Sequence, residues 1–124
     1  MEITTQHIAN VLLLRVAGRI DHSTAQAFEN ALIPQLDGCT GEHKKVLLEV
    51  SNIVYMSSAG LRVLMMAAKQ CRQQEGDIAI AALSPLLQEV FAISRFDRVF
   101  TIFPTIRAAL EALSPAAALV YGGA

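Results

Sequence analysis

A short apolar run followed by two serines and a long amphipathic segment restricts the fold of this chain more than any other feature. Val46–Val50 is the apolar run and is typical of a buried strand. Residues 58–75 show the periodicity of a helix, so Ser57 and Ser58 stand where the loop predicted after this strand enters a helix. The unpaired N–H groups of a helix start favour negative charge. A serine at this place can therefore cap the helix or carry a phosphate.

Strand and helix patterns alternate along the rest of the 124 residues. The predicted strands are residues 3–8, 11–16, 46–50, 77–83 and 99–103, and the predicted helices are residues 23–36, 58–75, 84–94 and 105–113. Pro34 should disturb the last turn of the first helix, and Gly76 is placed to end the second. This order predicts one α/β domain with a mainly parallel, mixed β-sheet, an N-terminal hairpin and helices packed against the sheet. The domain is expected over residues 1–114, with a flexible tail over residues 115–124 that has little helical patterning.

The predicted helix over residues 58–75 has two different faces. At 100° per residue, one face gathers apolar residues expected in the core: Leu61, Leu64, Ala68 and Cys71. The opposite face carries Ser58, Arg62, Met66, Lys69 and Gln73. Met66 is the unusual member of this polar stripe. It is interpreted either as a partner contact in line with Ser58 or as a single exposed apolar residue.

A second segment, Gly18–Ala25, follows the strand over residues 11–16. Asp21 or Ser23 can cap the next helix, and Ser23 with Gln26 fits a capping box. If Asp21 lies near Ser58, it also brings a carboxylate to the place where a phosphate would sit.

Composition and charge exclude several functions. The net charge is −1 and the Lys and Arg residues are scattered, which argues against a nucleic-acid or anionic-membrane surface. No apolar run is long enough to span a bilayer, so direct membrane insertion is not expected. The N-terminus lacks the basic region and long apolar core of a signal peptide, which predicts a cytoplasmic protein.

The residues that carry chemistry do not form a catalytic or metal-binding pattern. Histidines and cysteines lack the spacing of metal ligands, and no glycine-rich phosphate loop is present, so neither metal nor cofactor is expected. Ser58, His22 and Asp21 can be considered as a nucleophile with its partners. His22 and Asp21 are adjacent and would point apart, and the nucleophile elbow of hydrolases is missing. The sequence therefore favours a binding module over an enzyme.

Tyr55–Leu64 resembles the signature of the STAS domain, in which a strand is followed by hydrophobic-Met-Asp-Ser-Ser/Thr-Gly-Leu. Matching Met56 and Gly60 to this pattern places the family's phosphorylated serine on Ser58, with Ser57 where many members have Asp. Gly18–Ala25 is similar to the family's Gly-Glu-hydrophobic-Asp-x-x-Thr-Ala. The resemblance covers nearly the whole chain.

The resemblance implies a bacterial anti-sigma-factor antagonist. Such a protein binds an anti-sigma factor, usually a serine kinase, and thereby frees a sigma factor. The kinase phosphorylates the serine, here Ser58, and a serine phosphatase resets the switch. The residues expected at the partner surface are Asp21, Ser57, Ser58, Arg62, Met66 and Lys69. The alternative is a standalone STAS subunit of an ABC-type lipid transport complex, whose helix docks on an ATPase subunit without phosphorylation.

Overall fold

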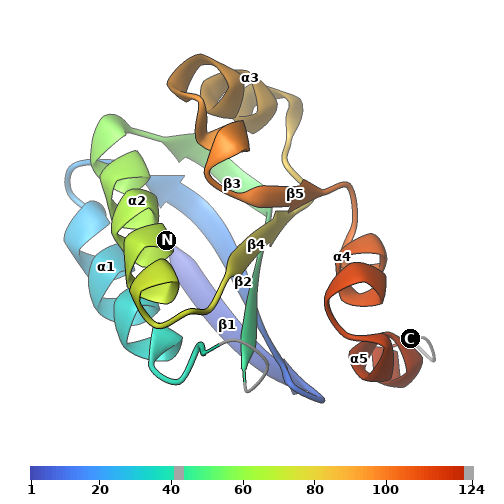
Figure 1. Ribbon diagram of the computed structural model, residues 1–124. Coiled ribbons are helices and arrows are strands. Elements are labelled where there is room, and N and C mark those ends of the chain that lie inside the picture. The colour runs from blue at the N-terminus through green and yellow to red at the C-terminus, as the bar shows by residue number, and fades with distance from the viewer. Residues whose placement is uncertain (41–43, 122–124) are drawn as a thin grey trace.

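A five-stranded sheet forms the centre of the computed structural model, which describes residues 1–40 and 44–121 (Figure 1). Its strands are β1 (Glu2–Ile8), β2 (Val11–Ile20), β3 (Lys45–Met56), β4 (Ile78–Ala81) and β5 (Thr101–Phe103). They lie side by side in the order β1-β2-β3-β4-β5. β1 and β2 form an antiparallel hairpin, and each later neighbour pairs in parallel. The predicted mixed, mainly parallel sheet is confirmed.

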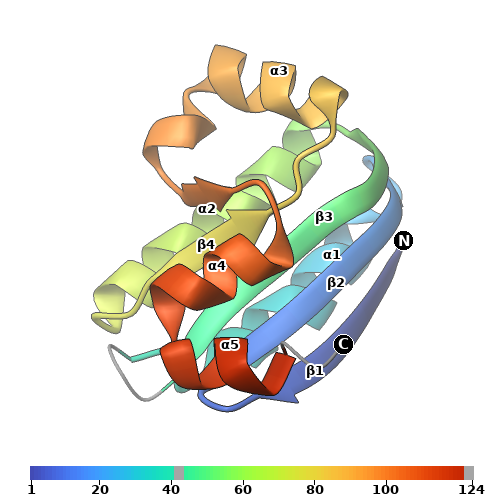
Figure 2. The same cartoon turned by 90° about the vertical axis from the view of Figure 1, so that its right-hand side faces the viewer.

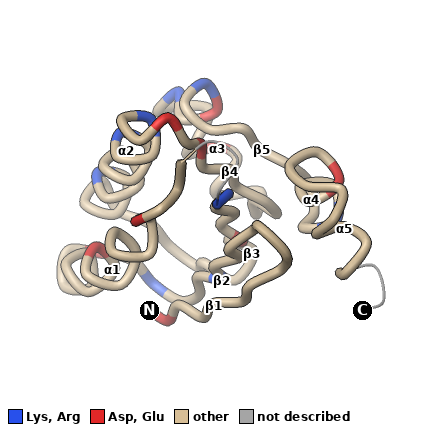
Figure 3. Tube along the Cα trace, turned by 60° about the horizontal axis from the view of Figure 1, so that its bottom comes forward, with Lys and Arg blue, Asp and Glu red and all other residues tan. Residues whose placement is uncertain are grey.

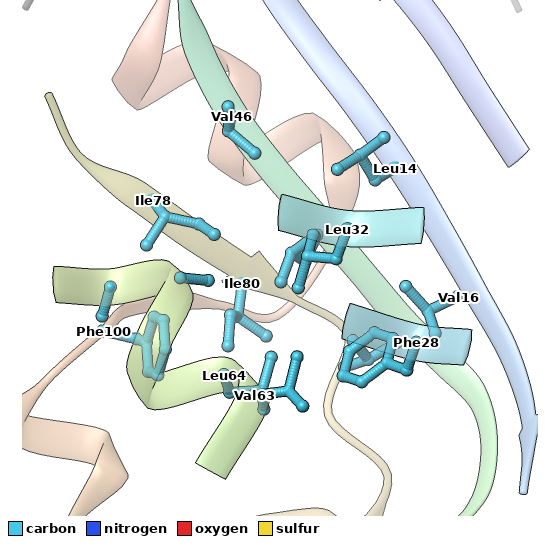
Figure 4. Close-up of a cluster of buried hydrophobic side chains, with 14 of the residues drawn as sticks. Leu14, Val16, Phe28, Leu32, Val46, Val63, Leu64, Ile78, Ile80 and Phe100 are labelled. Atoms are coloured by element: carbon cyan, nitrogen blue, oxygen red, sulfur yellow. The ribbon is translucent and has the colours of Figure 1, made fainter. Parts of the chain in front are cut away.

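Helices cover both faces of the sheet (Figures 1 and 2). One face packs against α1 (Ala25–Leu32), α2 (Ser58–Gln73) and α3 (Pro85–Ser94), and the other against α4 (Ile106–Leu113) and α5 (Pro115–Tyr121). Figure 4 shows the larger apolar cluster, in which side chains of the sheet meet those of α1 and α2. Because β2 and β3 are buried on both faces, their apolar runs are continuous rather than alternating.

β3 is longer than the predicted strand Val46–Val50, because it runs to Met56. Its second half pairs only with β2, which itself extends to Ile20, while β4 ends at Ala81. The pairing of β2 with β3 contains two register shifts, between Arg15 and Ala17 and between Gly18 and Arg19. The beginning of the signature segment is therefore strand rather than loop, and β3 leads directly into α2.

The first helix also differs from its prediction over residues 23–36. α1 ends at Leu32 and continues as a 3-10 helix, η1 (Ile33–Leu36), because Pro34 has no N–H to donate. The expected disturbance by Pro34 is confirmed. The expected capping box is wrong: Thr24 is the N-cap, no side chain caps it, and the hydroxyl of Ser23 donates instead to Asp21.

Gly76 has a different role from the predicted helix terminator. α2 ends at Gln73, and the left-handed residue that follows is Glu75, with φ of 61°. A Cβ atom on Gly76 would lie 2.3 Å from the carbonyl oxygen of Cys39. Glycine is required here because the backbone passes directly over Cys39, which is itself fully buried.

The predicted starts of the last two long helices are confirmed. The hydroxyl of Ser84 accepts a hydrogen bond from the N–H of Leu87 at 3.2 Å, and that of Thr105 accepts one from Ala108 at 3.0 Å. Both are N-caps, of α3 and α4 respectively. The strands before these helices, β4 and β5, are shorter than predicted.

The expectation of little helical structure after Pro115 is wrong, because Pro115–Tyr121 forms α5. The hydroxyl of Ser114 accepts a hydrogen bond from the N–H of Ala117 at 3.2 Å, and Ala117 is fully buried against the sheet. A helix as short as this one is stabilised by its packing against the rest of the protein rather than by the intrinsic helix propensity of its residues. Residues 122–124 of the predicted tail lie outside the described residues.

Basic and acidic residues are interspersed along the chain, and both signs occur on several elements (Figure 3). In the part of the chain that the structure describes, no helix combines the length and the apolar character needed to cross a bilayer.

Candidate functional site

α2 begins at the edge of the sheet where β2 and β3 end together. Ile20 and Met56, the last residues of these parallel strands, are paired, and the N–H of Ser57 donates to the carbonyl of Ile20 at 2.8 Å. Asp21 directly follows Ile20 and Ser57 directly follows Met56, so both residues come immediately after the last paired position of β2 and β3. The two predicted segments, far apart in the sequence, meet at this edge.

The two serines of the junction have different environments. Ser57 is the N-cap of α2, only 7% exposed, and its hydroxyl has no hydrogen-bond partner among the described residues. Ser58 is the first residue of α2 and is exposed. The side chain of Ser57 therefore does not belong to the surface that was predicted for it, whereas the hydroxyl of Ser58 is open to another protein.

Gly60 allows α2 to lie directly on the ends of the two strands. A Cβ atom at this position would come within 2.7 Å of Ile20 Cγ2 and 2.9 Å of Met56 Cγ. Any larger residue would push the first turn of α2, and with it Ser58, away from the sheet. The glycine of the signature therefore positions the serine, a role that the sequence pattern alone did not reveal.

Asp21 organises the neighbouring loop through its carboxylate. Oδ1 accepts hydrogen bonds from the N–H of Ser23 at 2.9 Å and from its hydroxyl at 2.7 Å, and Oδ2 accepts one from Nε of Arg19 at 3.1 Å. These bonds, the one from the Ser23 hydroxyl above all, lower the pKa of Asp21 from 3.8 to about 2. Asp21 is thus an anion that shapes the loop beside α2.

We expect Asp21→Asn to lower the melting temperature in a pH-dependent way. A carboxyl whose pKa is lowered in the folded state stabilises that state above its unfolded pKa of 3.8, and the stabilisation is lost as the pH falls to about 2. Thermal melts from pH 7 to pH 2 should show a constant difference between parent and variant above about pH 5 that disappears near pH 2. A difference that persists at pH 2 would contradict this role of the charge.

The exposed face of α2 carries the residues predicted for the partner surface. Ser58, Arg62, Met66 and Lys69 are all exposed, Met66 to 38%, and we call these four residues the α2 stripe. On the opposite face Leu64, Ala68 and Cys71 are buried as predicted, whereas Leu61 is only half-buried and packs against the core. Within the described chain, no hydrogen bond or ion pair joins the side chain of Arg62 or Lys69 to another residue, so both cations are available to a phosphate or a partner.

Sequence reasoning missed an aromatic contact beside this stripe. The guanidinium of Arg19 lies 4.2 Å from the centre of the Tyr55 ring, and the same Arg19 donates to Asp21. These residues sit opposite each other on β2 and β3. Tyr55 and Val54, which is 67% exposed, leave the last residues of β3 exposed just before α2 begins. Parallel pairing brings them together, and no local sequence signal indicates such a pairing.

The structure is thus an α/β domain whose sheet begins with a hairpin and whose helix α2 starts at two serines. The family model of the STAS domain matches residues 2–109. The chain is also 35% identical over 116 residues to the Bordetella bronchiseptica protein named "Putative anti-sigma factor antagonist BtrV", covering 94% of this chain and 97% of that protein. The chain therefore belongs to the STAS domain family.

Solved structures confirm the fold. An anti-sigma-factor antagonist (STAS) domain protein from Planctomyces limnophilus superposes with a TM-score of 0.80 at 21% identity, covering 90% of this chain and 97% of that one. The phosphorylated form of the Bacillus cell fate determinant SpoIIAA gives a TM-score of 0.63 at 15% identity, covering 90% and 99% of the two chains. The predicted STAS-like architecture is thus confirmed at both the sequence and the structural level.

Proposed function

We propose that this protein is an anti-sigma factor antagonist whose binding is switched by phosphorylation of Ser58. Its partner is an anti-sigma factor that is also a serine kinase, and a serine phosphatase restores the free hydroxyl. The protein is then a cytoplasmic regulator and a kinase substrate rather than an enzyme. The observation that carries the proposal is the contrast between an exposed Ser58 and a buried Ser57 at the start of α2. The similarity to BtrV supports the class of partner.

A phosphate at Ser58 can act without unfolding the domain. It would stand at the N-terminus of a helix of 16 residues, where unpaired N–H groups favour an anion. Arg62 lies four residues later on the same face and can pair with it. A partner packed against the α2 stripe would then meet nearly two extra negative charges and a larger group. The complex is expected to dissociate because this charge must be desolvated, not because the fold changes.

We expect Met66→Asp to weaken binding to the cognate anti-sigma factor by a few kcal/mol, because it buries a charge in a packed interface. Stability should change by only about 0.5 kcal/mol, since Met66 is partly exposed. Calorimetric titration and thermal melts measure the two effects. Leu119→Asp is the matched control, because Leu119 is 84% exposed on α5, on the opposite face of the sheet.

If Met66→Asp and the control Leu119→Asp both bound the anti-sigma factor as the parent does, the α2 stripe would not be part of the interface. Recovery of a transporter ATPase instead of a kinase in a pull-down from the native organism would favour the alternative, a STAS subunit of an ABC-type transport complex.

A further inference from the structure

A second group of charged side chains lies on the face of the sheet opposite α2. A cavity of about 470 Å³ opens there between β2, β3 and the start of α4, with Tyr121 of α5 at its side. Its polar lining consists of Arg15, Glu49, Ser51, Thr105, Arg107 and Tyr121. In Figure 2, α4 and α5 cross one part of this face, and β2 and β3 continue beyond them without a helix in front. The cavity thus lies where the helical cover of the sheet ends.

Glu49 is the most informative residue of this cavity. It is only 6% exposed, and its Oε1 accepts a hydrogen bond from the N–H of Ser51 at 2.8 Å. Over residues 1–40 and 44–121, the one ion pair joins Arg19 to Asp21, so no cation neutralises Glu49 directly. A buried carboxylate is costly unless a donor or a cation compensates it. The N–H of Ser51 uses only part of the acceptor capacity of this carboxylate, and because Glu49 lines an open cavity, the remainder can accept from a cationic group supplied from outside.

The same cavity offers cations to an anionic group. Arg15 stands beside Glu49 in the pairing of β2 with β3, and one of its N–H groups donates to Gln6 at 2.7 Å. A guanidinium has five donors, so Arg15 retains others for a ligand. Arg107, in the first turn of α4, is exposed and makes no ion pair within the described chain. The cavity therefore presents one buried anion and two cations to the same space.

Apolar side chains complete the wall. Ile106 and Pro104 lie at the start of α4, and Ala82 follows β4. A ligand that matches this lining carries an ammonium for Glu49, a carboxylate for the arginines, and an apolar group that packs against these apolar side chains. Complementary charges on a concave surface fix the orientation of such a molecule.

We propose that this cavity binds a free α-amino acid with an apolar side chain. The ammonium group donates to Glu49, and the carboxylate accepts from Arg15 and Arg107. The site is separated from the α2 stripe by the sheet, so it does not depend on the switch at Ser58. It adds a small-molecule site to a domain whose proposed partner is a protein.

The probe is L-leucine, added to ¹⁵N-labelled protein and followed by NMR. We expect saturable shifts of the amide signals of residues 49–51 and 105–107, with a Kd below about 10 mM. N-acetyl-L-leucine, which lacks the ammonium, and L-leucinamide, which lacks the carboxylate, should each bind about tenfold more weakly or worse. The reason is that N-acetyl-L-leucine cannot form the charge-assisted hydrogen bond to Glu49, and L-leucinamide cannot form those from the arginines.

Glu49→Gln and Arg107→Gln should each weaken L-leucine binding by about tenfold or more, whereas the control Arg72→Gln, on α2, should bind as the parent does. Glu49→Gln keeps an acceptor for the N–H of Ser51, and Arg107 is exposed, so at least one variant remains folded. The absence of saturable shifts up to about 10 mM would overturn the proposal. The proposal would also be overturned if N-acetyl-L-leucine and L-leucinamide bound as tightly as L-leucine, or if both variants bound L-leucine as tightly as the parent.

Discussion

Leu64→Ala is expected to destabilise the protein by about 2–5 kcal/mol, the range for removing a large apolar side chain from a core. Leu64 is 1% exposed and lies in the cluster that joins α2 to the sheet and to α1, together with Phe28 and Ile80 (Figure 4). The loss combines the transfer free energy of the side chain with the cavity it leaves. Urea denaturation followed by circular dichroism measures the change in the free energy of unfolding.

The control for this prediction is Leu86→Ala on α3, where the leucine is 49% exposed. Its cost should stay below about 1 kcal/mol, because about half of its surface already contacts water. If the two variants lost equal stability, the packing of α2 on the sheet would not be a main source of the protein's stability.

Ser58→Ala is expected to abolish phosphorylation by the cognate kinase, and Ser57→Ala to leave it intact. The exposed hydroxyl of Ser58 can enter a kinase active site, whereas Ser57 is 7% exposed and would require local unfolding. Incubation with kinase and labelled ATP, followed by peptide mapping, gives the answer. Label retained in Ser58→Ala and lost in Ser57→Ala would reverse the assignment.

The sequence pattern predicted those helices whose apolar periodicity or capping residues are visible within the segment itself. The helical phase of α2 separated buried Leu64 from exposed Met66, and the side-chain caps Ser84 and Thr105 marked the starts of α3 and α4. Each of these features depends on contacts within a few residues or on one apolar face, which a sequence displays directly.

Features that depend on distant contacts were not predictable in this way. The extension of β3 to Met56 requires β2 as a partner, and Gly76 is explained only by the backbone of Cys39 beside it. Ala117 holds α5 in place by packing against the sheet rather than by its own helical pattern. In each case tertiary packing overrides a weak local preference.

The candidate site shows the same division. Signature residues identified Ser58 and the stripe that follows it, because they are consecutive or share a helix face. The burial of Ser57 and the stacking of Arg19 on Tyr55 arise from the junction of two parallel strands, which no single segment describes. Gly60 belongs to both groups: it is a residue of the sequence motif, and its lack of a side chain sets the distance between α2 and the ends of β2 and β3.

The most direct test of the proposed switch is the affinity of the cognate anti-sigma factor for this protein before and after phosphorylation at Ser58. Calorimetry on the parent, the purified phosphoprotein and Ser58→Ala compares the three states, and circular dichroism verifies that each is folded. We predict tight binding by the unphosphorylated parent and by Ser58→Ala, and a loss of about tenfold or more in the phosphoprotein, with melting unchanged. Equal affinity of the phosphorylated and unphosphorylated proteins would contradict the switch.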